Sequence, residues 1–150
     1  MSDIEATLVE FRSKLGNSIL YPSHWIPNDK ETAFSISAPN GQAVISCLTF
    51  ATEGSGSLVD FGRRLVQELT SVEPTEWESC QVGNCRALKW QTNIENPDAT
   101  SHWLVYVLQC GQCYHALLVE LNEIVMALNW QFYEKLIETF NGNSGNSQDE

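Results

Sequence analysis

Alternating hydrophobic and polar positions fill the middle of the chain and predict β-strands there. Residues 34–38 alternate strictly, and Asn40-Gly41 follows, a dipeptide that favours the two positive-φ positions of a tight hairpin turn. A second strand is therefore expected over residues 43–50. The turn sets the register of this hairpin, and the predicted facing pairs are Phe34 with Cys47, Ile36 with Ile45, and Ala38 with Ala43. This register makes Cys47 an ordinary core residue.

Two amphipathic patterns farther along the chain predict helices. Ser57, with Asp60 three residues later, resembles a helix-capping box ahead of an apolar stripe, which predicts a helix over residues 58–71. Near the C-terminus, apolar side chains recur every four residues and predict a closing helix that stops at Asn141-Gly142. The residues of that second stripe are Ile124, Leu128, Phe132, Leu136 and Phe140.

Between these helices the pattern predicts four more strands, at residues 76–81, 85–93, 102–109 and 114–121. Their connections are short, which predicts an antiparallel meander. The third of these strands is apolar on both faces, as in a strand that is covered on both sides. The sequence therefore predicts a single-domain α/β (α+β) fold, an α/β/α sandwich around a mainly antiparallel sheet.

The N-terminal region is expected to begin with a helix. Ile4, Leu8, Phe11 and Leu15 are spaced by three or four residues, a spacing typical of a short helix that ends at Gly16. A short strand over residues 18–22 and a turn at Trp25 follow. The expected organisation is a helical segment at 1–17, an α/β domain at 18–141 and a mobile polar tail at 142–150.

Charge narrows the possible partners. Nineteen acidic and eight basic side chains give a formal net charge of −11 at pH 7, which repels nucleic acid and anionic lipid. The first residues lack the positive and apolar regions of a signal peptide, and no apolar run is long enough to span a bilayer. A cytoplasmic protein without nucleic-acid or membrane partners is expected. The acidic excess either steers a basic partner or only maintains solubility.

Four of the five cysteines are the main candidates for chemistry. Cys80 and Cys85 form one close pair, and Cys110 and Cys113 form another, a beginning shared by many structural zinc sites. If Asn93 faces His102, then Cys85 faces Cys110, and the short turns set Cys113 opposite Cys110 and Cys80 near Cys85. All four thiols are then expected in a row at one end of the sheet, on one face.

His115 is predicted on the same face as this four-cysteine row, two residues inward from Cys113. Neighbouring strands are about 4.8 Å apart, so a flat row of four spans roughly 14 Å, too wide for one zinc ion unless the tips curl together. Three interpretations stay open: reduced cysteines packed as small hydrophobic residues, cross-strand disulfides, and a metal or redox site. Cys110-Gly-Gln-Cys113 has thioredoxin-like spacing but falls in a hairpin turn, without a helix N-terminus to lower a thiol pKa.

No catalytic motif is present in the sequence. None of the three histidines stands beside a Gly-x-Ser-x-Gly nucleophile motif, so no catalytic or cofactor-binding residue is assigned, and a non-enzyme is expected. Trp90 and Trp103 share a face in the predicted register and are expected to pack under a helix. Trp77, with a glutamate on either side, is the tryptophan most suited to a surface and is a candidate docking residue.

The order of elements resembles the PsbP-like superfamily. A short strand ends in Tyr21-Pro-Ser-His-Trp25, and a hairpin, a helix, a four-strand meander and an amphipathic helix follow, so the resemblance covers residues 18–140. This group includes the extrinsic photosystem II protein, nuclear Ran-binding proteins and bacterial DcrB-like proteins, some of which are chaperones for secreted effectors. The resemblance implies an α/β/α sandwich that docks proteins and has no active site common to its members.

Two functions are therefore predicted from the sequence. The first is a non-enzymatic protein-binding domain, an adaptor or a secretion-effector chaperone with a protein partner. The alternative is a thiol-based metal-binding or redox protein that uses Cys80, Cys85, Cys110 and Cys113, with zinc as the metal. The first needs no cofactor. The sequence indicates neither the partner nor the oligomeric state.

Overall fold

The computed structural model describes residues 7–14, 16–31, 33–39, 41–51, 57–70, 76–83, 85–95, 100–110 and 113–142, without the side chains of 51, 70, 93–95, 100 and 122–130. Of the predicted mobile tail at 142–150, the structure describes only residue 142, and residues 143–150 lie outside the described residues. In the described part, the elements are β1 (Leu8–Arg12), β2 (Ser18–Pro22), β3 (Ile26–Asp29), β4 (Ala33–Ser37), β5 (Ala43–Ala51), α1 (Leu58–Thr70), β6 (Glu78–Val82), β7 (Cys85–Glu95), β8 (Thr100–Cys110), β9 (Cys113–Asn122) and α2 (Glu123–Glu138).

Seven strands form one antiparallel sheet in the order β3-β4-β5-β9-β8-β7-β6. The predicted hairpin is confirmed as β4–β5, with Phe34 opposite Cys47 and Ile36 opposite Ile45. The predicted meander is confirmed as β6–β9, and Asn93 lies opposite His102. The hairpin and the meander meet where β5 pairs with β9. Most strand pairings of the sheet could therefore be predicted from the short turns between neighbouring strands.

The predicted N-terminal helix is wrong for the residues that the structure describes. Residues 8–12 form β1, which pairs antiparallel with β2 in a separate two-stranded sheet. A lone strand at 18–22 would leave backbone groups unpaired, and β1 supplies their partners. Gly16, predicted as a helix stop, has φ 93° and lies between the two strands instead.

Strand β3 was not predicted, because Pro27 interrupts its short pattern and cannot donate a ladder hydrogen bond. It lies at the edge of the seven-stranded sheet, next to β4, where such a proline is tolerated.

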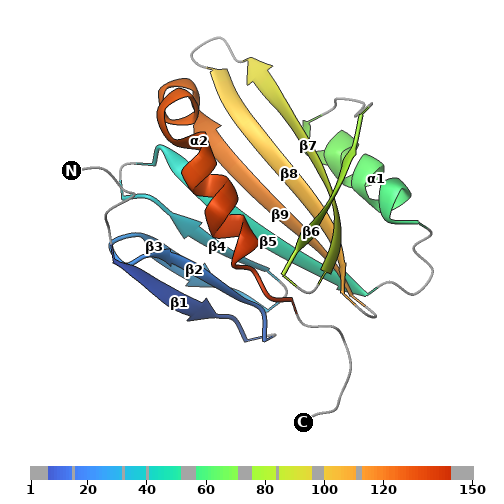
Figure 1. Cartoon of the computed structure of the whole chain (residues 1–150), viewed down its shortest axis with the longest axis horizontal. Coiled ribbons are helices and arrows are strands. Elements are labelled where there is room, and N and C mark those ends of the chain that lie inside the picture. The colour runs from blue at the N-terminus through green and yellow to red at the C-terminus, as the bar shows by residue number, and fades with distance from the viewer. Residues whose placement is uncertain are drawn as a thin grey trace.

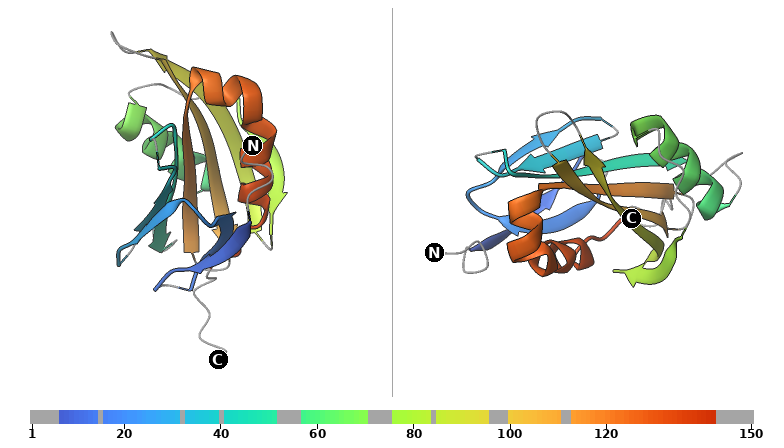
Figure 2. Two further views of the ribbon diagram at one scale, coloured as in Figure 1. Left: turned by 90° about the vertical axis from the view of Figure 1, so that its left-hand side faces the viewer. Right: turned by 90° about the horizontal axis from the view of Figure 1, so that it is seen from above.

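The two faces of the sheet carry different elements, as the predicted sandwich requires. Figure 2 shows α2 and the β1–β2 hairpin on one side of the sheet and α1 on the other. Figure 1, viewed from the α2 side, shows α2 crossing in front of the strands. In the described part, no helix is long and apolar enough to cross a membrane.

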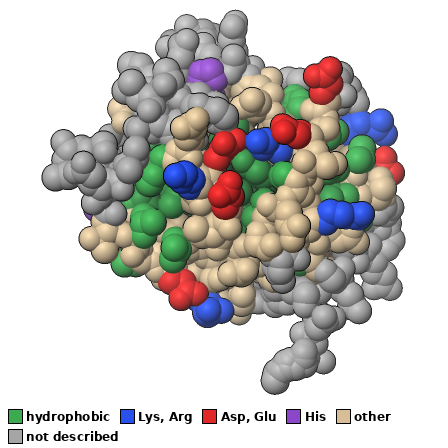
Figure 3. Space-filling model, viewed as in Figure 1, with side chains coloured by type: hydrophobic (Ala, Val, Ile, Leu, Met, Phe, Trp, Pro, Cys, Tyr) green, Lys and Arg blue, Asp and Glu red, His purple; other side chains and the backbone are tan. Residues whose placement is uncertain are grey.

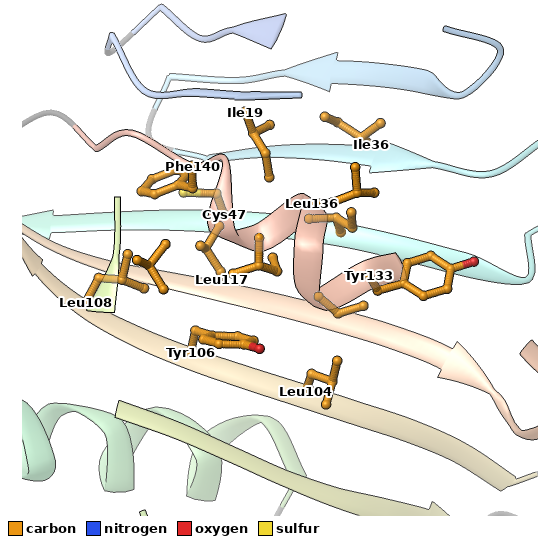
Figure 4. Packing of buried hydrophobic residues seen from close by; sticks show 14 of the residues in the cluster. Ile19, Ile36, Cys47, Leu104, Tyr106, Leu108, Leu117, Tyr133, Leu136 and Phe140 are labelled. Carbon is orange, nitrogen blue, oxygen red and sulfur yellow. The ribbon is translucent and has the colours of Figure 1, made fainter. Parts of the chain in front are cut away.

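The face under α2 and the β1–β2 hairpin is closed over the main core. A row across four neighbouring strands, Ile36, Ile45, Val119 and Leu104, is 0% exposed at every position. Side chains of α2 pack on this row (Figure 4), and Tyr133, Leu136 and Ile137 are buried there, as is Phe140, which follows the helix. Cys47 belongs to the same core, as predicted.

Helix α1 packs on the other face over a second core cluster. Its first turn is capped by Ser57, whose Oγ accepts a hydrogen bond of 3.1 Å from the Asp60 amide, so the predicted capping position is confirmed. At Gly62 the helix approaches the sheet so closely that a Cβ atom would lie 2.9 Å from the Trp77 indole and 3.1 Å from Val107. Any side chain at this position would force Trp77 or Val107 to shift, so glycine suits this helix–sheet contact.

Candidate functional site

The α1 face of the sheet is covered over only part of its width. One row of directly paired residues crosses six strands on this face and is at least partly exposed along its whole length. The members of this row, named here the open row, are Ile26, Ser37, Val44, Glu120, Trp103 and Thr92, in the order β3-β4-β5-β9-β8-β7.

The neighbouring row on the same face shows where the cover of α1 begins. Leu118, Val105 and Trp90 in that row are 7%, 1% and 9% exposed, and they belong to the cluster under α1. Ser35 and Ser46 continue the same row onto β4 and β5 and are partly exposed. The open surface is therefore widest over β3, β4 and β5 and narrows toward β7.

Apolar and hydroxyl side chains alternate on this open surface. Ile26, Val44 and Trp103 supply apolar area, serines and a threonine supply hydroxyl groups, and Glu120 supplies one carboxylate. A shallow hollow of about 190 Å³ adjoins it. The lining residues of this hollow are Asn28, Lys30, Ala33, Phe34, Ser35, Ser46 and Leu48. Aromatic side chains are enriched in protein interfaces and charged side chains are depleted from their centres, so the apolar members of this surface are its best contacts for a partner.

Exposed large hydrophobic side chains gather on the same side. Five are exposed among the described residues, and Ile26 and Phe50 point to the α1 face of the sheet while Val59 and Leu69 belong to α1 itself. Their exposed fractions are 60%, 41%, 45% and 47%. Only Leu8 among the five lies elsewhere, on β1. The open row and these side chains together are the candidate docking surface of the protein.

Trp77, the docking residue predicted from the sequence, lies beside this surface, but its side chain packs against other residues of the domain. Its side chain is partly buried, packs against the α1 cluster, and has its ring centroid 6.2 Å from that of Trp90. The predicted packing of Trp90 under a helix is confirmed, since it is buried in that cluster, whereas Trp103 packs against the cluster and remains partly exposed. A docking role for Trp77 stays a prediction.

The other candidate, the four-cysteine row, is largely assembled as predicted. Cys85 and Cys110 face each other on β7 and β8 and form a disulfide with a Cα–Cα distance of 4.9 Å. Cys113 lies directly opposite Cys110 on β9 and is a free, partly exposed thiol. The disulfide interpretation therefore holds for one pair of the four.

Cys80 is displaced from the predicted row. Val82 pairs with Cys85, so two residues link β6 to β7 where three were expected, and Cys80 faces Ala87 instead. Cys80 is a free, partly exposed thiol on the same face of the sheet as Cys85. Its partner Ala87 lies two residues along β7 from Cys85. The remaining cysteines, Cys85, Cys110 and Cys113, form a straight line across three strands, named here the three-cysteine line.

The chain segment after α2 covers the disulfide. A Cβ atom on Gly142 would lie 2.9 Å from the Cys110 sulfur and 2.7 Å from His115 Nε2, so this backbone rests on both. Two backbone hydrogen bonds of 2.8 and 2.9 Å join Asn141 to Ser18 and hold the segment against β2. Cys85 and Cys110 are accordingly only 0% and 3% exposed.

His115 lies on the cysteine face, as predicted, and is completely buried. Its Nδ1 atom lies 3.0 Å from the Thr49 hydroxyl, which also accepts a hydrogen bond of 2.9 Å from the Asn17 side chain. The ring also packs edge-on against Phe140, at a centroid distance of 5.5 Å. Asn17 and Thr49 were not predicted, because their partners are set by the β5–β9 pairing and the N-terminal hairpin.

Burial keeps the free thiols protonated. Desolvation raises the pKa of Cys80 and of Cys113, and it raises the pKa of Cys47 from 9.0 to about 12. Neither partly exposed thiol is thus a pre-formed thiolate nucleophile. Among the described residues, no group of three or more His, Cys, Asp and Glu side chains is placed to hold a metal ion. Zinc binding by the four cysteines requires reduction of the disulfide and stays a prediction.

A partly buried ion pair joins the far edge of the sheet to α2. Lys89 Nζ donates a hydrogen bond of 3.0 Å to Glu134 Oε2 and lies 3.9 Å from Glu78 Oε1. Burial lowers the pKa of Lys89, but Glu134 and Glu78 together outweigh it and hold this pKa above the ordinary value. Figure 3 shows acidic and basic side chains interspersed among the described residues of this face.

Comparison with known proteins identifies the fold. No protein-family model and no curated protein sequence matches the chain. Cyanobacterial PsbP (CyanoP) from Synechocystis is similar in structure, with a TM-score of 0.71 and 14% identity over 92% of this chain and 94% of that one. A variant of the protein Mog1 has a TM-score of 0.59 and 13% identity, over 90% of this chain and 95% of that one.

A protein from Bacteroides thetaiotaomicron aligns with a TM-score of 0.66 and 14% identity over 94% of this chain, which spans 50% of that longer protein. These likenesses confirm the predicted PsbP-like fold.

Proposed function

We propose that this chain, which has the PsbP-like fold, is a non-enzymatic protein-binding domain that docks a partner on the α1 face of its sheet. Four of the five exposed large hydrophobic side chains in the described part lie on that face or on α1, and this observation carries the proposal. Exposed apolar side chains that form one patch mark protein-interaction sites, whereas single scattered ones are ordinary. The other face has a closed core and no comparable surface among the described residues.

The comparisons support the same general role. The structural likeness to PsbP and Mog1 favours a protein-interaction function without catalysis. An adaptor or a secretion-effector chaperone is the finer form of this proposal. The net charge of −11 further favours a partner with a basic surface around its apolar centre. Location in the cytoplasm stays a prediction.

The experiment places a photo-crosslinking amino acid at Ser37, in the middle of the open row, and in a second variant at Glu10, an exposed position on β1. Each variant is expressed and irradiated in the native host, and the adducts are identified by mass spectrometry. The proposal expects one recurrent protein adduct at Ser37 that is missing at Glu10. Equal adducts at both positions, or none at Ser37, would contradict it.

The captured partner then allows a quantitative test with purified proteins. Phe50→Ser and Leu8→Ser are matched, since both side chains are 41% exposed, but Phe50 is on the α1 face and Leu8 is on β1. Loss of an interface side chain of this kind weakens binding by about five- to thirty-fold. We expect that loss for Phe50→Ser and unchanged affinity for Leu8→Ser. The reverse order would place the partner on the other face.

A further inference from the structure

The three-cysteine line places a free thiol next to an existing disulfide. Cys85, Cys110 and Cys113 come from the adjacent strands β7, β8 and β9. Cys110 is bonded to Cys85 on one side and lies directly opposite Cys113 on the other. The central sulfur therefore has two neighbours of the same chemical kind, and only one of them is bonded to it.

This arrangement is the one that thiol–disulfide exchange requires. An attacking thiolate approaches a disulfide sulfur along the extension of the sulfur–sulfur bond, so that attacker and leaving group lie on opposite sides. Adjacent strands are about 4.8 Å apart, and residues directly opposite each other share a face. Cys113 and Cys85 thus flank Cys110 from opposite directions, and no change of strand register is needed to bring them into line.

We propose that Cys110 is a shared sulfur and that the disulfide can move from Cys85–Cys110 to Cys110–Cys113. The Cys113 thiol loses its proton, and its sulfur attacks Cys110 Sγ. A Cys113–Cys110 bond forms, the Cys110–Cys85 bond breaks, and Cys85 leaves as a thiolate that takes up a proton. One disulfide and one thiol are present before and after the step, so no oxidant or reductant is consumed.

The exchange gives the buried disulfide a route to solvent. Cys85 and Cys110 lie beneath the segment at residues 140–142, whereas Cys113 is partly exposed. After the exchange, a low-molecular-weight thiol can attack the Cys113 sulfur. A mixed disulfide forms on Cys113 and Cys110 is released as a thiol; a second molecule of that thiol then restores Cys113 and leaves as the small-molecule disulfide. Cys113 is therefore the position through which a small thiol reduces this disulfide.

The other free thiols lack this geometry and serve as controls. Cys80 is partly exposed like Cys113, but it faces Ala87 and is not opposite either bonded cysteine. Cys47 is buried and faces Leu117 on β9. The inference does not depend on the proposed docking function, since the three-cysteine line lies on the α2 face of the sheet.

The test follows reduction of the Cys85–Cys110 disulfide in the folded full-length protein with glutathione as the small thiol. Samples are quenched with acid at intervals, the free thiols are alkylated, and the disulfide-linked peptides are identified by mass spectrometry. Without the internal relay, Cys113→Ser should be reduced more slowly than the unmodified protein by about tenfold or more. Cys80→Ser should match the unmodified protein, in which a Cys110–Cys113 peptide should appear transiently.

Two further measurements keep the result interpretable. Circular dichroism and thermal unfolding check that Cys113→Ser folds, and Cys113→Ala replaces it if it does not. In unfolding concentrations of urea, glutathione reaches the disulfide directly, so the difference in reduction rate between the Cys113→Ser and unmodified proteins should be much smaller than in the folded state. Equal rates in the folded state without a Cys110–Cys113 peptide, or a rate difference that is just as large in urea, would overturn the proposal.

Discussion

The two faces of the sheet are built from the same strands, but they differ in how completely they are buried. On β5, Ile45 points to the α2 face and is 0% exposed, while its neighbour Val44 points to the α1 face and remains partly exposed. The α2 face has two covers, a helix and a β-hairpin, whereas the α1 face has one helix over part of its width. The α2 face is therefore buried more completely, and the α1 face keeps apolar side chains accessible to solvent beside its smaller core.

The largest expected difference between the faces is in chemical reactivity. Ser46 and Cys47 are neighbours on β5 that point to opposite faces, and burial raises the pKa of Cys47 to about 12. An ordinary thiol has about a thousand times more thiolate at neutral pH. We expect Ser46→Cys to react rapidly with iodoacetamide in the native protein while Cys47 remains unmodified, as measured by peptide mass spectrometry. Modification of Cys47 at a similar rate would show that the α2 face opens readily.

The next largest difference is in folding stability, and two valines provide a matched pair. Val119 is 0% exposed on the α2 face, and Val44 is partly exposed in the open row. Val119→Ala should lower the free energy of unfolding by about 2 to 3 kcal/mol through lost burial and a cavity. Val44→Ala should lower it by less than about 1 kcal/mol. Urea denaturation measures both, and equal losses would mean that both faces are equally covered.

The contact of α1 with the sheet is tested by Gly62→Ala. Alanine favours a helix over glycine by about 1 kcal/mol, but the added methyl group would press on Trp77 and Val107 at a cost of about 1 to 3 kcal/mol. We expect a net loss of up to about 2 kcal/mol in urea denaturation. The double variant Gly62→Ala, Trp77→Ala removes the Trp77 part of the clash, so its loss should be smaller than the sum of the two single losses. A stabilised Gly62→Ala protein would show that α1 is free to move outward.

The smallest effect is expected at the ion pair between β7 and α2. Lys89→Met removes the partner of Glu134 and should cost about 1 kcal/mol, because both groups are largely shielded from solvent. Arg12→Met breaks an exposed pair with Glu10 on β1 and should leave stability nearly unchanged.

The stabilisation by Lys89 also has a definite pH dependence. The folded-state pKa of Lys89 is above its ordinary value of 10.5, so its contribution is complete below pH 10.5 and is lost as the pH rises through the folded-state value. The stability gap between the unmodified protein and Lys89→Met should therefore be constant from neutral pH upward and close only in strong alkali. Unfolding by urea at several pH values measures this gap. A gap that closes already near pH 8 would contradict the assignment.

Local patterns predicted the parts of the fold that local physics decides. Asn40-Gly41 and the short turns of the meander set strand registers that the structure confirms, and these registers correctly placed Cys110 between Cys85 and Cys113. One turn shorter by a residue than predicted moved Cys80 out of the row. Register propagates from turns, so an error in a turn displaces everything beyond it.

The candidate docking surface could not be predicted in the same way. Trp90 and Trp103 share a face in the sequence-derived register, yet Trp90 is 9% exposed under α1 and Trp103 is partly exposed in the open row. The difference in their exposure depends on where α1 packs on the sheet. That position is set by the close contact at Gly62, which strand periodicity does not predict. The strand at residues 8–12 likewise depends on a tertiary contact, its pairing with β2, and not on the local spacing of apolar residues.

The pairing of β5 with β9 also governs the order in which the chain can fold. The three strands β3–β4–β5 and the four strands β6–β9 each pair through short turns. Strands β5 and β9 are far apart in sequence, and such non-local pairing is slow. During synthesis, β5 emerges from the ribosome long before β9 and must wait as an unpaired edge. An apolar edge of this kind is the part of a sheet most prone to aggregation. The last strand to be made, β9, is thus the central strand of the sheet, and its pairing covers the edge of β5.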